Sequence, residues 1–407
     1  MKRNCFLLLW CVVLCSMMYC RNLEHVKADN LTEWEEPSDL YGLSALLMDA
    51  ETGEVLFEKN GTQPLAVAST TKILTCILAL ENCQLDEIVT ISEYAEKQPD
   101  VQMNAAAGEE YLLGDLLKGM MLESYNDISV AVAEHVCGST EEFAGLMNKK
   151  AEELGCKNSY FITPNGLDDV KNEMENHSTA EDMAKIMCYA IKNKSFLEIT
   201  QTQEWMIREC EGKRTVSAQN KNRFLQEYDG MISGKTGFTN KAGYCYVGAG
   251  KRDERTFVAV TLGCGWPPNK NFKWSDTRKL LDYGFENFAY RSIDYQGVSI
   301  PDSVYVENGR SPYGEEIDQV HIQIPTIEKV LLGKNDTFYG KVYLKEKVSA
   351  PVKKGEQVGR IDLYKNGALI GQKHILAADN VVKSNIWYNI WKNCVAFLTK
   401  ISKKYCN

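Results

Sequence analysis

The stretch from Ala66 to Leu80 constrains this chain most, because it combines a helix signal with two side chains that can react together. Its sequence, AVASTTKILTCILAL, places hydroxyl residues where a helix would begin and apolar residues behind them. Ser69 and Lys72 lie three positions apart, so a helix sets the amine over the same face as the hydroxyl. A lysine whose pKa is lowered by burial or by a neighbouring cation can activate a serine nucleophile. An ordinary helix start gives the same pattern, so both interpretations stay open on these residues alone.

Two later motifs favour the catalytic interpretation. Ser124–Asn126 lies between two apolar helical patterns, where a loop can present a hydroxyl and an amide. Lys235–Gly237 opens a strand-like run after a turn that contains glycine. S-x-x-K, an S-D-N element and K-T-G occur together in class A β-lactamases and penicillin-binding proteins. All three occur here in that order, and the combination is far more specific than any one of them.

The sequence around these motifs points to a narrower family. The segments concerned are LMNKKAEELG at Leu146–Gly155, TPNGLDD at Thr163–Asp169, HSTAEDMA at His177–Ala184 and GKTGFTNKAGY at Gly234–Tyr244. On these residues and Ser69–Lys72, the chain resembles the low-molecular-mass penicillin-binding proteins, which are serine-type D-alanyl-D-alanine carboxypeptidases. The resemblance runs from about Leu43 to Phe288.

The expected fold is α+β. A strand pair at Ser44–Asp49 and Glu54–Glu58 opens the domain, and a second hairpin forms from Gly243–Gly248 and Arg255–Leu262. Between them and after them, apolar spacings of three and four predict helices over Tyr111–Leu122, Asp127–Val136, Thr140–Leu154, Thr179–Ile191 and Thr277–Phe288. Early and late strands would join in one antiparallel sheet. The resemblance implies the same β-lactamase/transpeptidase-like arrangement, an antiparallel sheet with a helical cluster.

The resemblance also implies a role for each motif residue. Three residues would carry out catalysis: the nucleophile Ser69, the base Lys72 and the proton relay Ser124. Five would bind substrate: Asn126 at the amide carbonyl, Lys235 and Thr236 at the terminal carboxylate, Gly237 by leaving room for the peptide, and Phe238 through a backbone N–H that completes an oxyanion hole with that of Ser69. The cation Lys235 would lower the pKa of Lys72 by like-charge repulsion.

Two positions depart from the family pattern. Tyr125 stands where the family usually has a small residue, and a ring there would narrow the cleft. Asn165 stands where relatives often have histidine. Lys221 and Lys273 are compatible either with added positive charge near the substrate carboxylate or with a solvated surface.

Composition bounds the remaining functions. The 407-residue chain has a net charge of −9 and contains no basic block long enough to indicate nucleic-acid binding. Of its fourteen cysteines, ten follow the first twenty residues, and none of them forms a C-x-x-C pair. No H-x-x-H pair occurs either, so the sequence predicts no metal site and no cofactor.

The N-terminus reads as a secretory signal over residues 1–28. Lys2 and Arg3 precede the apolar run Phe6–Met18, and Val26–Ala28 offers a cleavage site. A polar linker over residues 29–39 would follow. The protein is therefore expected to be exported and to act outside the cytoplasm.

After a penicillin-binding carboxypeptidase domain over residues 40–290, the sequence changes character. Short β-rich runs and turn signals such as Asn308-Gly309 and Lys365-Asn366-Gly367 predict a small all-β domain over residues 291–382. Residues 383–407 carry tryptophans and lysines at helical spacing, which favours an amphipathic helix lying on the outer face of the cytoplasmic membrane. Packing of this helix on the protein itself is the alternative.

These observations together predict a serine D-Ala-D-Ala carboxypeptidase that removes the terminal D-alanine from peptidoglycan stem pentapeptides. β-Lactams would inhibit it by acylating Ser69. A β-lactamase would use the same three motifs, but it needs neither a β-rich domain nor a membrane helix. A catalytically inactive peptidoglycan-binding protein and an endopeptidase acting on cross-links are further alternatives.

Overall fold

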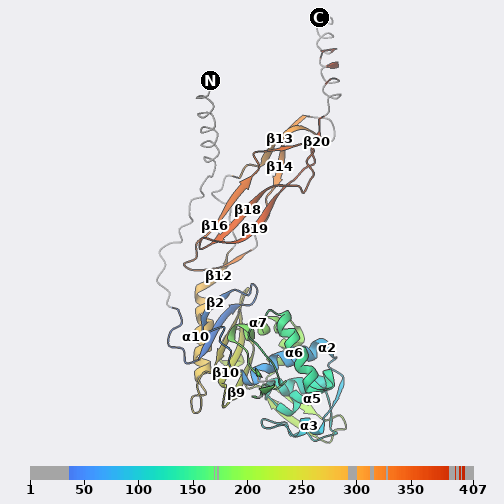
Figure 1. Ribbon diagram of the computed structural model, residues 1–407, viewed down its shortest axis with the longest axis vertical. Coiled ribbons are helices and arrows are strands. Elements are labelled where there is room, and N and C mark those ends of the chain that lie inside the picture. Colours follow the sequence, from blue (N-terminus) through green and yellow to red (C-terminus); the bar gives the residue numbers. More distant parts are fainter. Residues whose placement is uncertain are drawn as a thin grey trace. The chain divides into compact units, whose positions relative to one another are not determined.

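The structure is a computed structural model that describes residues 36–168, 170–171, 174–291, 300–311, 316–326 and 329–384, together with 390, 394–395 and 397–398. The chain divides between Phe288 and Ala289 into two units, which are described separately (Figure 1). The predicted signal peptide, most of the linker and most of the predicted terminal helix lie outside the described residues. Among the residues described, no helix is both long enough and apolar enough to cross a membrane.

A five-stranded antiparallel sheet is the centre of the first unit. Its strands are β1 (Ser44–Asp49), β2 (Val55–Lys59), β9 (Met231–Thr239), β10 (Gly243–Arg252) and β11 (Arg255–Leu262). They lie in the order β2-β1-β11-β10-β9, so β9 is an edge strand. Ser44 pairs with Leu262 and Asp49 with Phe257, which confirms that early and late strands join in one sheet.

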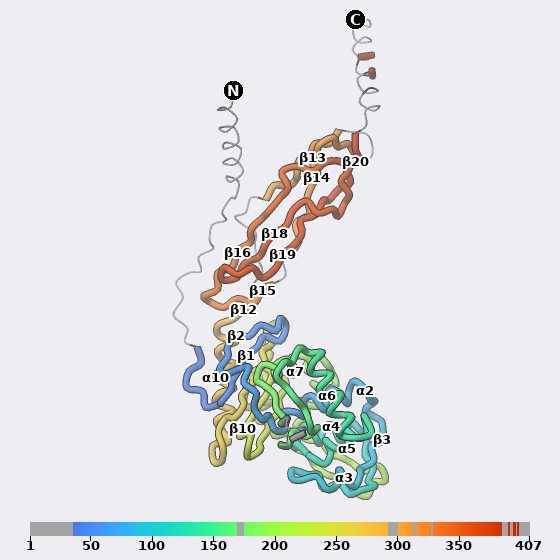
Figure 2. The backbone as a smooth tube through the Cα atoms, in the orientation of Figure 1, coloured from blue at the N-terminus to red at the C-terminus, as the bar shows by residue number. Residues whose placement is uncertain are grey.

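Helices cover both faces of this sheet. They are the 3₁₀ turn η1 (Ala68–Thr71) and the helices α2 (Lys72–Asn82), α3 (Glu93–Glu96), α4 (Leu113–Leu122), α5 (Asn126–Cys137), α6 (Thr140–Glu153), α7 (Ala180–Ala190), α8 (Lys194–Gln201), α9 (Phe224–Glu227) and α10 (Phe272–Asn287). Met48 contacts Cys188 of α7, whereas the neighbouring Leu47 lies against Gly284 of α10. Successive strand residues face opposite ways, so α7 and α10 cover opposite faces. Figure 2 shows α10 beside β1 and β2, although these elements lie at opposite ends of the unit's sequence.

Most of the predicted helices are confirmed, with shifted ends. Ser139 and Thr179 start α6 and α7 by accepting hydrogen bonds from main-chain N–H groups at 3.1 and 3.0 Å. The predicted helix at Tyr111 begins two residues later, because Glu110–Leu112 forms strand β4, which pairs with β3 (Ile88–Thr90). α10 begins at Phe272, five residues before the predicted start at Thr277.

Helix α2 is deeply buried in the first unit. Every residue from Lys72 to Ala79 is buried, and α2 packs against α4, α5, α6 and α7. A helix that is apolar all round is buried on all sides. The side chain of Lys72 therefore lies within the hydrophobic core, where burial disfavours its charged form.

Three small two-stranded sheets complete the described part of the first unit. One is the β3–β4 pair, another joins β5 (Val170–Lys171) to β6 (Met174–Glu175), and the third joins β7 (Glu204–Arg208) to β8 (Thr215–Gln219).

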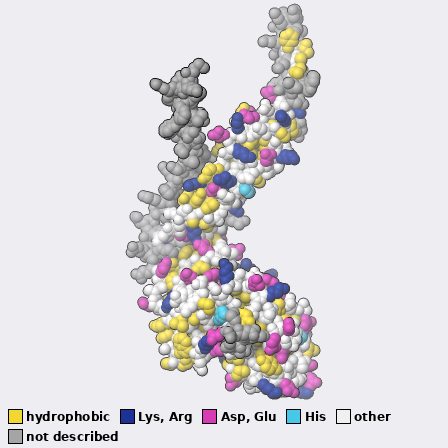
Figure 3. Space-filling view, in the orientation of Figure 1, with side chains coloured by type: hydrophobic (Ala, Val, Ile, Leu, Met, Phe, Trp, Pro, Cys, Tyr) yellow, Lys and Arg dark blue, Asp and Glu magenta, His cyan; other side chains and the backbone are white. Residues whose placement is uncertain are grey.

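The second unit contains strands but no helix in its described residues up to Ser384, and residues 390, 394–395 and 397–398 are helical. Its main sheet has the order β16-β18-β19-β14-β13-β17, and β20 also pairs with β13. The strands of this sheet are β13 (Ser303–Arg310), β14 (Glu316–Gln323), β16 (Phe338–Leu344), β17 (Lys347–Ser349), β18 (Gln357–Lys365), β19 (Ala368–Ala377) and β20 (Val382–Lys383). A separate two-stranded sheet joins β12 (Phe288–Arg291) to β15 (Val330–Gly333). Asn308 and Gly309 lie inside β13 at an irregularity of the β13–β14 register, so the turn predicted there is wrong. On the face shown in Figure 3, basic and acidic side chains are interspersed over both units.

Candidate active site

The local backbone brings Ser69 and Lys72 together. Ser69 lies in η1, in which side chains three residues apart eclipse each other, and Lys72 is the first residue of α2. The Nζ of Lys72 is 2.9 Å from the Oγ of Ser69. Ala68 has a φ of 48°, a left-handed conformation that is costly for a residue with a Cβ. Ser69 is partly exposed while Lys72 is fully buried, so a substrate can reach the hydroxyl but water is kept from the amine.

The surroundings of Lys72 favour a neutral amine. Its Nζ also contacts the side-chain oxygen of Asn126 at 2.8 Å and the main-chain carbonyl of Asn165 at 2.7 Å. Burial lowers the pKa of Lys72 well below its usual value, and the positive charge of Lys235 lowers it further, against an opposing effect of Asp127. A buried neutral amine at hydrogen-bonding distance from a serine can take the proton of that serine.

A second serine and lysine meet at long range. The Nζ of Lys235 donates to the Oγ of Ser124 at 2.9 Å, across 111 positions of sequence. Ser124 has a φ of 75°, so its backbone, like that of Ala68, is in the left-handed region. Burial lowers the pKa of Lys235 to about 7, although the carboxylate of Glu123 opposes this shift. Lys235 is therefore a cation below neutral pH and loses its charge above it.

Asn126 connects Lys72 to a neighbouring loop. Its side-chain N–H groups donate to the main-chain carbonyls of Pro99 and Asp100, each at 3.0 Å, while its oxygen accepts from Lys72. Its own backbone N–H donates to the carbonyl of Val101 at 2.7 Å. Both amide donors are therefore engaged, and the predicted contact with a substrate carbonyl requires one of them to be released.

Tyr125 does not narrow the cleft as its position in the sequence suggested. Its side chain is only 7% exposed and belongs to the hydrophobic core. The ring lies against Gly119 of α4, where a Cβ would come within 3.3 Å of it. The absence of a side chain at Gly119 thus makes room for the large residue inside the second motif.

The third motif lies within strand β9, which begins four residues before the predicted start of the strand and precedes the predicted hairpin of β10 and β11. Lys235 and Gly237 are buried, Thr236 is partly buried, and Phe238 is 38% exposed. A Cβ on Gly237 would lie 3.1 Å from the backbone nitrogen of Ser69, so the glycine allows β9 to approach η1 closely. β9 is an edge strand, and an extended peptide can align beside such a strand.

Two carbonyls of β9 already accept bonds from side chains. Gln201, the last residue of α8, donates to the carbonyl of Ile232 at 3.0 Å. Lys235 donates to the carbonyl of Thr236, also at 3.0 Å. The amine of Lys235 therefore links the serine of the second motif to the edge strand.

The loop from Thr163 to Asp168 contributes main-chain atoms that the sequence did not reveal. Besides the carbonyl of Asn165 on Lys72, the carbonyl of Pro164 accepts from Thr75 of α2 at 2.6 Å. Gly166 has a φ of 80°, and a Cβ there would lie 2.0 Å from the carbonyl oxygen of Ala68. The Asn-Gly pair was the available signal, since it commonly marks a turn with positive φ.

The two further lysines have different surroundings. Lys221 is half exposed and forms an ion pair with Glu123, the residue before Ser124, at 2.9 Å. Lys273 is buried, lies over the ring of Tyr244 and has its pKa lowered by burial to about 8. Neither lysine has a described contact with the serine–lysine pairs.

Comparison with known proteins identifies the class. Residues 31–265 match the family described as D-alanyl-D-alanine carboxypeptidase, and residues 326–383 match the penicillin-binding protein 5 C-terminal domain. The chain belongs to the D-alanyl-D-alanine carboxypeptidase family and is a serine-type peptidase of the low-molecular-mass penicillin-binding class.

Individual relatives are similar to this chain over most of their length. The chain is 34% identical to D-alanyl-D-alanine carboxypeptidase DacF of Bacillus subtilis, over 84% of this chain and 86% of the relative. It is 30% identical to DacC of Escherichia coli, over 85% and 86%. The crystal structure of penicillin binding protein 5 from Haemophilus influenzae superimposes with a TM-score of 0.67 and 25% identity, covering 86% of this chain and 100% of that one.

Proposed function

We propose that this protein removes the terminal D-alanine from peptidoglycan stem pentapeptides through an acyl-enzyme on Ser69. The observation that carries the proposal is the contact between Ser69 and Lys72, because the hydroxyl is accessible and the amine is fully buried. The lowered pKa of Lys72 makes its neutral form available at the pH at which an ordinary lysine is charged.

Acylation would move one proton from Ser69 to the leaving amine, by way of Lys72 and Ser124. Lys72 takes the proton of Ser69 as the Oγ attacks the carbonyl carbon of the penultimate D-alanine. The C–N bond to the last D-alanine then breaks, and its amine receives a proton through Ser124, which Lys235 holds at 2.9 Å. Backbone N–H groups of Ser69 and Phe238 would stabilise the oxyanion. Water completes the reaction by hydrolysing the ester.

The substrate would lie along β9. This strand is an edge strand, and the charged form of Lys235 together with the hydroxyl of Thr236 suits a terminal carboxylate. Asn126 would bind the substrate's amide carbonyl after releasing one of its two loop contacts. A β-lactam would acylate Ser69 in the same way, because its strained amide presents the same carbonyl and carboxylate.

The test compares two reactions of the purified mature protein. A stem pentapeptide is expected to release D-alanine, and penicillin is expected to leave a long-lived adduct visible as an increase in intact mass. Both should be lost in Ser69→Ala, while the matched variant Ser275→Ala, at an exposed position of α10, should retain them. Rapid penicillin hydrolysis without D-alanine release would instead make the protein a β-lactamase. Neither reaction in a folded protein would leave a peptidoglycan-binding role.

The same proposal includes export and attachment to the outer face of the cytoplasmic membrane. Residues 1–28 would be removed as a signal peptide, and residues 383–407 would lie on the membrane as an amphipathic helix. The carboxypeptidase domain would span residues 40–290 and the β-rich domain residues 291–382. Flotation with anionic lipid vesicles, with and without residues 383–407, tests the attachment. Equal flotation of the two forms would contradict it.

A further inference from the structure

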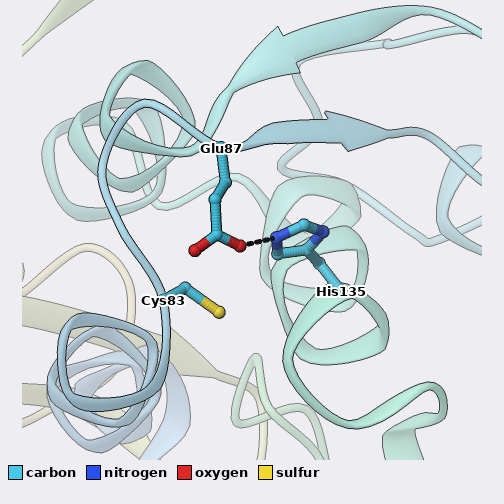
Figure 4. Close-up of side chains that lie close together, drawn as sticks. All are labelled: Cys83, Glu87 and His135. Atoms are coloured by element: carbon cyan, nitrogen blue, oxygen red, sulfur yellow. Dashed lines mark hydrogen bonds and ion pairs between the residues drawn. The ribbon is translucent and has the colours of Figure 1, made fainter.

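Three metal-ligating side chains converge at the ends of helices α2 and α5. Cys83 follows the last residue of α2, Glu87 precedes strand β3, and His135 lies in the last turn of α5. The ligand atoms of all three lie within 4.8 Å of one another. Figure 4 shows the imidazole facing the carboxylate, with the thiol beside them. The Nε2 of His135 is 2.9 Å from a carboxylate oxygen of Glu87.

We propose that Cys83, Glu87 and His135 bind one divalent transition-metal ion, and that zinc is the ion best suited to them. Zinc prefers sulfur, nitrogen and carboxylate oxygen ligands in a tetrahedral arrangement. At bond lengths of about 2.0–2.3 Å, tetrahedral ligand atoms lie roughly 3.3–3.8 Å apart. Small side-chain rotations therefore suffice to close the present spacing around an ion. Water or Cys137, two residues beyond His135, would take the fourth position.

The carboxylate of Glu87 is already oriented and charged. One of its oxygens accepts from the backbone N–H of Gln84 at 2.6 Å, and the other faces His135. These contacts lower the pKa of Glu87 below its usual value. The side chains of His135 and Glu87 are 22% and 40% exposed, so an ion can reach them from solvent.

Metal binding is coupled to the loss of a proton from the Cys83 thiol. Burial raises its pKa, and the nearby Glu87 and Cys137 raise it further, so the metal-free thiol keeps its proton at neutral pH. A metal ion must displace that proton to gain a thiolate ligand. Binding of zinc is therefore expected to release a proton.

The position of the cluster gives it a structural meaning. α2 begins at Lys72 and α5 begins at Asn126, both in the candidate active site, and the two helices pack against each other. Their other ends carry Cys83 and His135. A bound ion would tie together the far ends of the two helices that hold the first and second motifs. It would not take part in the reaction, and its existence does not depend on the proposed function.

The sequence predicted no metal site because these three ligands do not form a pair with close, regular spacing in the chain. Glu87 follows Cys83 by four positions, but His135 is 48 positions beyond Glu87. Only the packing of α5 against the segment after α2 brings the three together.

The experiment measures zinc binding by the full mature protein, purified with a reductant and stripped of metal. Titration against a chromophoric chelator is expected to give one zinc per chain, and cobalt should produce thiolate charge-transfer absorption. Zinc affinity should fall at least tenfold in Cys83→Ser and in His135→Gln. Matched controls, Cys210→Ser and His177→Gln, alter a cysteine and a histidine outside the cluster and should bind zinc as the unaltered protein does.

A second measurement guards against misfolded variants. Zinc should raise the melting temperature of the unaltered protein and of both controls but not that of folded His135→Gln, with folding checked by circular dichroism. Binding unchanged in both cluster variants would overturn the proposal. Absence of stoichiometric binding by the reduced protein, or a disulfide between Cys83 and Cys137 that persists under the reductant, would overturn it as well.

Discussion

The two serine–lysine pairs of the site have the same hydrogen-bond length but opposite origins. Ser69 and Lys72 are 2.9 Å apart because one 3₁₀ turn superposes them. Ser124 and Lys235 are 2.9 Å apart because a loop residue with left-handed backbone meets an edge strand. The first pair is a property of a short segment, whereas the second exists only in the folded unit.

The two lysines also differ in what burial does to them. Burial and the neighbouring cation Lys235 lower the pKa of Lys72, which suits it to the proposed role of a base. Lys235, with its pKa near 7 and Glu123 opposing the shift, can still carry a charge for a carboxylate. In the proposed mechanism, similar burial therefore serves proton transfer in one pair and substrate binding in the other.

The largest effect is expected from removing the base of the local pair. Lys72→Met should lower kcat/KM for D-alanine release by about 10³-fold, because general-base assistance contributes about 10²–10⁴-fold. Penicillin acylation, followed by intact mass, should slow by a similar factor. Lys221→Met alters an exposed lysine of the same unit and should leave acylation near its normal rate. Normal acylation in Lys72→Met would show that Lys72 is not the base for Ser69.

Gly166→Ala tests whether the loop behind the local pair is fixed by backbone geometry. The new Cβ would lie 2.0 Å from the carbonyl oxygen of Ala68, at a φ of 80°, so the loop that presents Asn165 to Lys72 must move. We expect a loss of at least about 2 kcal/mol in the free energy of unfolding, measured in urea.

Gly145→Ala is the control for this prediction. Gly145 lies in α6 with open space around it, so alanine should stabilise the protein by up to about 1 kcal/mol. Equal stability of the two variants would show that the loop adapts freely.

The long-range pair should reveal itself in the pH profile. Only the charged form of Lys235 attracts a terminal carboxylate, and its fraction falls about tenfold per pH unit above a pKa of about 7. Accordingly, kcat/KM for the pentapeptide should decline above neutral pH, measured from pH 6 to 9. A peptide amide that lacks the carboxylate should not show this decline, nor should Lys235→Gln. A flat profile for the pentapeptide would assign the carboxylate to another group.

The smallest expected effect concerns the strained backbone of Ser124. Ser124→Ala and Ser124→Gly both remove the hydroxyl, so both should lose activity to a similar extent. Glycine adopts a φ of 75° without steric cost, whereas alanine does not. The glycine variant should therefore be more stable by about 1 kcal/mol in urea unfolding. A more stable alanine variant would show that the left-handed conformation is not a source of strain.

The sequence predicted those parts of the structure that depend on local patterns. The apolar run after Ser69 gave α2, and the spacing of Ser69 and Lys72 gave their contact. The antiparallel sheet of early and late strands was also predicted, because the motifs are typical of a known family.

The remaining details depend on tertiary packing. The carbonyl of Asn165 reaches Lys72 through the main chain, which no side-chain motif records. The direction of the Tyr125 ring follows from the space at Gly119, one helix earlier. The engaged amide of Asn126 depends on carbonyls of the loop at Pro99 and Asp100. Each of these contacts joins segments whose proximity only the complete fold determines.

The side-chain bonds on β9 also bear on how the protein avoids aggregation. An exposed edge strand is a template on which a strand of another molecule can pair, and natural sheets block such edges with charged or bonded side chains. In β9, Gln201 and Lys235 already occupy the carbonyls of Ile232 and Thr236. The lysine proposed to bind substrate therefore also makes the strand a poorer partner for a second copy of the sheet. The same side chain thus contributes both to solubility and to the proposed substrate binding.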